Sequence, residues 1–358
     1  MNAKFYVKPG FFDEKPFVII ENGSMSVSLF RFSSGVEAIR LQNTNGELII
    51  LPYKGMQIWR ASFLGHDLTM RTMFDEPAAS NEFLKTYGGF MVHCGLTGIG
   101  SPSAGDKHAQ HGELPNAPFN SAWIQPGMDE NGKYIIVSGT YRHVVGFTVG
   151  YAFTVNYKLY EDASAVTTSI EIENLRDRRL PYMYLCHANF IPVNGSRLLD
   201  TARREAGSYK VHDSGNGEKI TAWINTLRED LSAQYTIGCE RECYDPEVCV
   251  TLGYIPDENG FAHTMQILPD GYAHFISHPV EALPVPVRWI SRTGDEDALG
   301  MALPATAEHL GYSNAEKKGQ IKFVEPKGRI SFTLEAGLLE PENVKLMTKK
   351  IESARLLY

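Results

Sequence analysis

The 358-residue sequence lacks the features that would direct it to a membrane or to nucleic acid. No apolar run approaches the ~18 residues that a membrane span needs. The N-terminus, Met1-Asn2-Ala3-Lys4-Phe5, has no continuous apolar stretch of the kind found in signal peptides. Basic residues are outnumbered, with 34 Lys and Arg against 42 Asp and Glu, which gives a formal net charge of −8. Because nucleic acids and anionic membranes attract basic patches, we expect neither as a partner, and we expect a cytoplasmic protein.

Cysteine is scarce, with five residues in the whole chain. An odd number in a chain without a secretion signal is typical of reduced thiols. Cys239, Cys243 and Cys249 lie close together, but they lack the paired short spacings of a structural zinc site and have no histidine among them. We therefore expect no metal and no cofactor.

Helical periodicity is also rare, whereas alternation of apolar and polar residues is frequent. Residues 25–29 alternate after an Asn22-Gly23 turn, which predicts a β-hairpin. Residues 151–159 and 166–172 alternate on either side of a short polar turn, which predicts an antiparallel pair with one buried face. Many short strands separated by Gly, Pro, Asn and Asp predict an all-β sandwich.

We expect one sandwich domain over residues 1–340, since large all-β sandwiches often form a single domain. Residues 341–358 form a predicted helical appendage, because Val344, Met347, Ile351 and Ala354 recur at helical spacing after Pro341. The least regular part, residues 205–260, has the character of an insertion with a short helix around residues 220–228.

Two histidine motifs stand out. The first, His108-Ala109-Gln110-His111-Gly112-Glu113, lies in a Gly- and Pro-rich loop from Cys94 to Pro118. The second, Cys186-His187-Ala188-Asn189-Phe190, follows an apolar, strand-like run. Loops this long are commonly functional. His108 and His111 are three positions apart, a spacing that brings two side chains to one metal ion only on a helix. The glycines and prolines of this loop forbid a helix, so the pair does not predict a metal site.

In order and spacing, these motifs resemble the galactose mutarotase (aldose 1-epimerase) superfamily, and most closely its bacterial aldose-1-epimerase-like branch. Three further segments fit that branch: Cys94–Gly100, Leu283-Pro284 with Trp289, and Pro326–Arg329. The resemblance covers roughly residues 15–340. It implies a large antiparallel two-sheet supersandwich, a small-molecule carbohydrate as partner, and a monomer or homodimer.

Mutarotation opens a sugar ring and closes it on the other face, which requires a general acid and a general base. The resemblance implies that His187 is the acid and that His111 holds the sugar, so both are expected to converge on one concave surface. Glu113, two residues beyond His111, completes the candidate catalytic set. The alternatives are a packed structural histidine at 187, a simple loop histidine at 111 and a solvated carboxylate at 113.

Six further residues are candidate sugar ligands. Arginine offers several fixed donors, tryptophan offers an apolar platform, and Asn189 has the further option of orienting His187. Core packing is the alternative role of Trp289. The set comprises Arg60, Arg71, His108, Asn189, Arg288 and Trp289.

One residue departs from the family pattern. In the branch that this chain resembles, a catalytic glutamate precedes a proline on a late strand, whereas here the segment reads Ala302-Leu303-Pro304. An alkyl side chain cannot accept a proton, so another carboxylate would have to substitute. The candidates are Glu113, Glu281, Asp295 and Glu308.

The sequence therefore favours an aldose 1-epimerase-like enzyme that acts on a monosaccharide or a derivative. A sugar-binding protein that lost its base at Leu303 is the first alternative. The second is a different isomerase or lyase acting on an acidic or keto sugar. That second alternative predicts that Arg60, Arg71 and Arg288 converge on the cleft.

Overall fold

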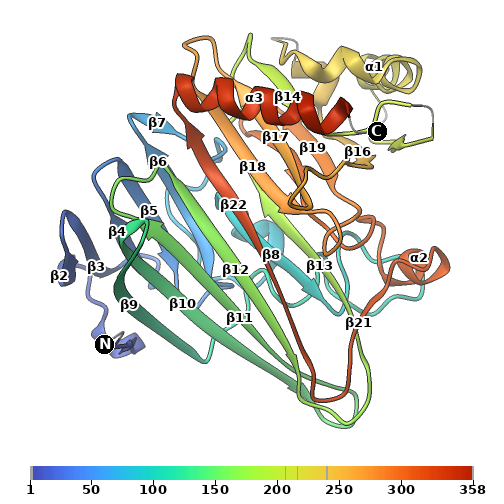
Figure 1. The fold of residues 1–358 in the computed structure, drawn as a ribbon. Helices are drawn as coiled ribbons and strands as arrows, with labels where there is room; N and C mark the ends of the chain where they lie inside the picture. The colour runs from blue at the N-terminus through green and yellow to red at the C-terminus, as the bar shows by residue number, and fades with distance from the viewer. Residues whose placement is uncertain (1–2, 206, 216, 239–240, 357–358) are drawn as a thin grey trace.

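The computed structural model describes residues 3–205, 207–215, 217–238 and 241–356, and antiparallel strands dominate it (Figure 1). The first sheet has nine strands in the order β1-β9-β10-β11-β12-β22-β18-β17-β14. Their bounds are β1 Phe5–Val7, β9 Ser121–Asp129, β10 Gly132–Val145, β11 Val149–Tyr160, β12 Ala165–Asn174, β22 Arg329–Leu339, β18 Ala273–Pro279, β17 Phe261–Ile267 and β14 Arg197–Asp200.

The second sheet also has nine strands, in the order β2-β3-β4-β5-β6-β8-β13-β21, with β7 paired to β6. Their bounds are β2 Phe17–Asn22, β3 Met25–Arg31, β4 Glu37–Gln42, β5 Gly46–Leu51, β6 Gln57–Phe63, β7 His66–Asp67, β8 Met91–Leu96, β13 Leu180–Ala188 and β21 Lys322–Val324.

A third sheet of four strands follows the order β15-β16-β19-β20. Its strands are β15 Tyr209–Val211, β16 Val248–Leu252, β19 Val287–Arg292 and β20 Asp297–Leu303. The α-helices are α1 Glu218–Glu229, α2 Tyr312–Lys317 and α3 Pro341–Leu356, and short 3-10 helices cover Pro9–Phe11, Phe83–Lys85, Leu231–Tyr235 and Arg241–Tyr244. Within the described ranges, no helix is both long and apolar enough to cross a membrane.

The two large sheets pack face to face because each presents one apolar face. On β11, alternate residues from Tyr151 to Leu159 are buried, as the period-two pattern predicts. Between the sheets, His93 of β8 bonds through Nε2 to the Tyr157 hydroxyl (2.7 Å) and through Nδ1 to the Tyr184 hydroxyl (2.8 Å). A histidine in this core is acceptable because both ring nitrogens have partners.

The third sheet continues the second across the β13–β20 boundary. Cys186 donates its backbone N–H to the Pro304 carbonyl at 2.9 Å, and Phe190 donates to the Leu299 carbonyl at 3.0 Å. Strands β8, β13, β20, β19 and β16 therefore share an outer face, away from the main core. This face carries the candidate site.

The predicted all-β class is confirmed, and the four-stranded third sheet adds to the expected two. The hairpin at Asn22 is confirmed, with Asn22 opposite Met25, and so is the pairing of β11 with β12. The expected loop is shorter than predicted, because β8 continues to Leu96.

Both predicted helices are present, as α1 and α3. Helix α3, red at the top of Figure 1, lies across the sheet ends at β14 and β22. Its buried Val344 and Ile351 pack on Phe275, and Lys350 pairs with Asp257 at 2.8 Å. The helix therefore covers apolar side chains of the first sheet.

Candidate functional site

His111 and His187 meet in one cavity on the outer face, although 76 positions separate them in the sequence. Their ring centroids are 5.3 Å apart and the rings are nearly perpendicular, at 73°. The cavity has a volume of about 70 Å³. The expected convergence of these two side chains is confirmed. Because the cavity is smaller than the ~300–1,000 Å³ typical of small-molecule pockets, only part of a sugar would enter it.

Strand alternation determines which residues reach this cavity. On β13, Leu185 and His187 point to the outer face, whereas Tyr184 and Cys186 point into the main core. On β19, Trp289 lines the cavity. The remaining lining residues come from β16, β19, β20 and the loops beside these strands and after β8: Gly100, Ser101, Gln110, Glu247, Cys249, Val287, Leu303 and His309.

A hydrogen-bond network holds His187 in place. Its Nδ1 lies 2.6 Å from Asn189 Oδ1, and the Tyr87 hydroxyl contacts both Asn189 Oδ1 and His187 Nδ1 at 3.0 Å. Asn189 is itself fixed, because its Nδ2 donates to the Gly89 carbonyl at 2.9 Å. Burial lowers the pKa of His187 to about 4, although the bond to Asn189 acts in the opposite direction. Asn189 therefore has the orienting position that the sequence suggested as an option.

His111 is held by the loop that carries it. Its backbone adopts a left-handed conformation (φ 59°), its Nδ1 accepts a hydrogen bond from the Gly100 N–H at 3.4 Å, and its ring packs on Phe83 at 4.7 Å. Burial, followed by the proximity of His187, lowers the pKa of His111 well below its usual value. At neutral pH His111 and His187 are therefore uncharged.

Trp289 and Glu247 form one wall of the cavity. Cys249 on β16 lies directly opposite Trp289 on β19, so Glu247, two residues before Cys249, projects on the same side. The Trp289 indole donates to Glu247 Oε2 at 2.6 Å, and its ring lies 5.0 Å from that of His187. Sequence reasoning missed Glu247, because no local motif marks it and it lies within the irregular segment 205–260.

Leu303 lines the same cavity and is 2% exposed. The carboxylates considered as substitutes do not line it. Glu308 pairs with Lys318 at 2.6 Å and with Lys210 at 3.4 Å, while Glu281 and Asp295 are exposed. Glu247 is thus the carboxylate that the described cavity lining contains.

Hydrogen-bond donors of the protein surround the Glu113 carboxylate. Its carboxylate accepts hydrogen bonds from the N–H groups of Leu96 (3.1 Å) and Thr97 (3.3 Å) and from the Thr97 and Tyr151 hydroxyls. Four donors occupy this carboxylate, so its placement corrects the expectation that it shares a cavity with the histidines.

His108 is also placed outside the cavity. Its ring packs against Gly98, Nδ1 donates to the Ala109 carbonyl at 2.7 Å, and Nε2 lies 3.5 Å from Asp106. Four histidines and carboxylates surround the first motif: Asp106, His108, His111 and Glu113. Of these, His111 alone lines the cavity.

The three arginines predicted as ligands do not line the cavity either. Arg288 is fully buried and pairs with Asp200, because it precedes Trp289 by one residue and so points to the opposite face of β19. Arg60 donates to the carbonyls of Trp59 and Gly88, both at 2.8 Å, and Arg71 donates to the Gly294 carbonyl at 2.6 Å. These placements correct the expectation of an arginine clamp.

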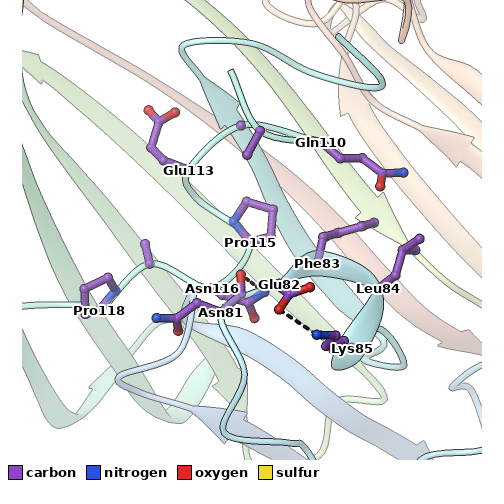
Figure 2. Close-up of a pocket in the computed structure, with 13 residues that line it drawn as sticks. Asn81, Glu82, Phe83, Leu84, Lys85, Gln110, Glu113, Pro115, Asn116 and Pro118 are labelled. Atoms are coloured by element: carbon purple, nitrogen blue, oxygen red, sulfur yellow. Dashed lines mark hydrogen bonds and ion pairs between the residues drawn. The ribbon is translucent and has the colours of Figure 1, made fainter. Parts of the chain in front are cut away.

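A wider groove of about 640 Å³ adjoins the cavity (Figure 2). It runs between the 3-10 helix Phe83–Lys85 and loop residues 109–118, and Gln110 lines both hollows. Glu82 and Lys85, joined by a dashed line in Figure 2, pair at 2.7 Å beside it. The groove is larger but contains neither His111 nor His187, so we assign the candidate chemistry to the smaller cavity.

Nothing in the described ranges groups three or more His, Cys, Asp or Glu side chains so that they could hold a metal ion. Cys94, Cys186 and Cys249 are free thiols, and Cys239 lies outside the described residues.

Solved structures with the same fold come from several bacteria. A candidate aldose 1-epimerase from Klebsiella pneumoniae superposes with a TM-score of 0.85 at 16% identity, covering 99% of this chain and 96% of that one. A galactose mutarotase-like protein from Clostridium acetobutylicum gives 0.63 at 14% identity, covering 89% and 100%. A galactose 1-epimerase from Lactobacillus acidophilus gives 0.52 at 13% identity, covering 95% and 99%. At these identities the likeness establishes the mutarotase-like fold.

No curated protein matches the sequence. A family model does match, and it spans residues 33–338, which is most of the chain. The protein therefore belongs to the family described as "Domain of unknown function (DUF4432)".

Proposed function

We propose that this protein binds a monosaccharide, or a derivative of one, by its anomeric edge and catalyses its anomerisation, as an aldose 1-epimerase does. The observation that carries the proposal is the meeting of His111, His187 and Trp289, from three separate segments, in one cavity. Polar groups that converge beside an apolar surface are the usual signature of a small-molecule site.

The reaction chemistry fits these groups. Ring opening removes the proton of the anomeric hydroxyl and adds one to the ring oxygen, and both oxygens are bonded to the same carbon. Two imidazoles with centroids 5.3 Å apart can contact both oxygens of one sugar. In this proposal His187 delivers the proton to the ring oxygen, His111 binds a sugar oxygen, and the indole of Trp289 packs on the ring.

The lining supports an uncharged sugar. An acidic substrate would call for cationic groups in the cavity, yet Arg60, Arg71 and Arg288 are engaged elsewhere. The proposed setting is the cytoplasm, which suits the free thiols of Cys94, Cys186 and Cys249.

A sugar-binding protein without catalysis is the second candidate, and Leu303 favours it. An alkyl group at the position where the related branch has its glutamate removes the usual base while the rest of the cavity persists. This candidate predicts saturable sugar binding with no effect on the rate of anomer exchange.

The test is anomer exchange of D-glucose and D-galactose, followed by NMR exchange spectroscopy or polarimetry. We expect His187→Ala to abolish the protein-dependent rate while the thermal transition stays nearly unchanged. His66→Ala, on β7 outside the cavity, is the matched control and should retain the rate. If His187→Ala unfolds the protein instead, His187 is a structural residue and the proposal loses its main support.

A further inference from the structure

The partners of His187 determine which of its ring nitrogens carries the proton. Nδ1 lies 2.6 Å from Asn189 Oδ1. An amide oxygen only accepts hydrogen bonds, so Nδ1 must donate. A neutral imidazole has one N–H group, and therefore Nε2 carries a lone pair.

The orientation of the Asn189 amide is fixed independently. Its other end lies 2.9 Å from the Gly89 backbone carbonyl, which only accepts, so that end must be the NH₂ group. The Tyr87 hydroxyl is 3.0 Å from Asn189 Oδ1 and from His187 Nδ1, but 3.4 Å from His187 Nε2. Because Nδ1 already donates, it cannot accept the tyrosine proton, which is therefore best placed on the amide oxygen. The lone pair of Nε2 is left for a ligand.

His111 has the opposite tautomer. The Gly100 N–H, which can only donate, points to Nδ1 at 3.4 Å. The proton of neutral His111 is therefore on Nε2, which makes no hydrogen bond to the described protein residues. His187 and His111 thus offer one acceptor nitrogen and one donor nitrogen, on rings whose centroids are 5.3 Å apart.

From this geometry, and resting on the function proposed above, we propose that His187 meets the sugar as a proton acceptor and alone serves as base and then acid. Nε2 of His187 takes the proton of the anomeric hydroxyl. The anomeric C–O bond to the ring oxygen breaks, its electron pair moves to the ring oxygen, and the hydroxyl oxygen becomes the carbonyl oxygen of the open-chain aldehyde.

The ring oxygen then takes the same proton back from His187 Nε2, so the imidazole returns to its neutral form and no net proton is exchanged. Rotation about the neighbouring C–C bond and the reverse steps close the ring on the other face. His111 donates its Nε2–H to a sugar oxygen throughout. A shuttle of this kind needs no carboxylate, which makes it compatible with Leu303.

The surroundings of His187 favour the neutral starting form. The pKa of His187 is lowered to about 4 by burial, and the nearby His309 contributes in the same direction. The titratable groups that line the cavity or pack behind it are Tyr87, Cys94, His111, Glu247, Cys249 and His309. Among these groups Glu247 is the one carboxylic side chain, and it accepts a hydrogen bond from the Trp289 indole.

The first experiment measures the tautomers directly. Long-range ¹H–¹⁵N NMR on protein carrying ¹⁵N-histidine, assigned with His187→Gln and His111→Gln, should show at pH 7 an Nδ1–H tautomer for His187 and an Nε2–H tautomer for His111. An Nε2–H tautomer or a doubly protonated ring at His187 overturns the inference. An inactive protein with the expected tautomers instead refutes the proposed function, and the shuttle with it.

The second experiment measures kcat/KM for D-galactose anomer exchange against pH, with the uncatalysed rate subtracted. The shuttle predicts a rate that rises through pH about 4 and stays level through neutral pH. A free enzyme that must begin as the imidazolium acid would lose rate over the same range. We also expect His187→Gln to lose at least ~10-fold more rate than Glu247→Gln. The reverse order would make Glu247 the base and overturn the shuttle.

Discussion

Under the proposed function, Leu303 is the residue that limits the catalytic capacity of this cavity. It lines the cavity with His111 and His187, and its side chain can neither accept nor donate a proton. A single imidazole that shuttles one proton lacks the gain of a separate, well-placed base, which is typically worth ~10²–10⁴-fold in rate. We therefore expect the wild-type protein to be a weak mutarotase on common aldoses.

Leu303→Glu should raise the rate of glucose and galactose anomer exchange by at least ~10-fold, because it places a carboxylate beside the histidines. Since position 303 is 2% exposed, the free energy of unfolding should fall by at least ~1–3 kcal/mol. Leu303→Gln, with a similar shape and no basic carboxylate, is the control and should not gain rate. A fast wild type that retains its rate after single replacement of Glu113, Glu247, Glu281, Asp295 and Glu308 would contradict this prediction.

At the scale of elements, the loop of residues 97–118 must hold His111 against the sheet without regular structure of its own. Glu113 contributes by accepting hydrogen bonds from Leu96, Thr97 and Tyr151, which tie the loop to β8 and β11. Hydrogen bonds to a charged acceptor are among the stronger ones. The carboxylate therefore acts as an anchor for the segment that presents His111.

Glu113→Gln should lower the free energy of unfolding by about 1–3 kcal/mol, because an amide accepts fewer hydrogen bonds than a carboxylate and leaves donors unpaired. In anomer-exchange assays KM should rise more than kcat falls, since the loop is loosened and no proton-transfer group is removed. Glu82→Gln, at an exposed carboxylate beside the groove, is the control and should change neither stability nor KM. A kcat loss of ~10²-fold or more at unchanged stability would instead make Glu113 the base.

At the scale of the whole molecule, several histidines are buried in their uncharged form. Burial lowers the pKa of His93, His274 and His278 to about 3. For His187, His212 and His309 it lowers the pKa to about 4. In the unfolded chain these groups would titrate near the ordinary value of 6.5, so unfolding takes up protons below that pH.

The stability that comes from this difference is complete above pH 6.5 and is lost as the pH falls from 6.5 towards 4. We expect the free energy of unfolding to fall by several times ~1.4 kcal/mol per pH unit between pH 6 and 5, measured by urea denaturation, since each such histidine contributes about that amount. His278→Leu removes one such group, fully buried and without a ring-nitrogen partner among the described residues, and should reduce the slope by about 1.4 kcal/mol per pH unit. A flat profile from pH 7 to 5 would contradict this account.

The sequence by itself determined the features that depend on neighbouring residues. The period-two pattern of residues 151–159 made them a strand with one buried face, because side chains on a strand alternate between its faces. Helical spacing after Pro341 gave α3, and Asn22-Gly23 gave the first hairpin. The two histidine motifs, through their resemblance to mutarotases, located His111 and His187, which the fold brings together.

Only the tertiary structure decided which other side chains accompany them. Glu247 reaches the cavity because β16 pairs with β19, a partnership across 42 residues that no local pattern encodes. Trp289 lines the cavity while Arg288 is buried against Asp200, since one step along a strand reverses the direction of a side chain. Glu113 became an anchor because the fold brings Tyr151 and the end of β8 to it. Long-range strand pairing and register therefore determine which side chains line the cavity.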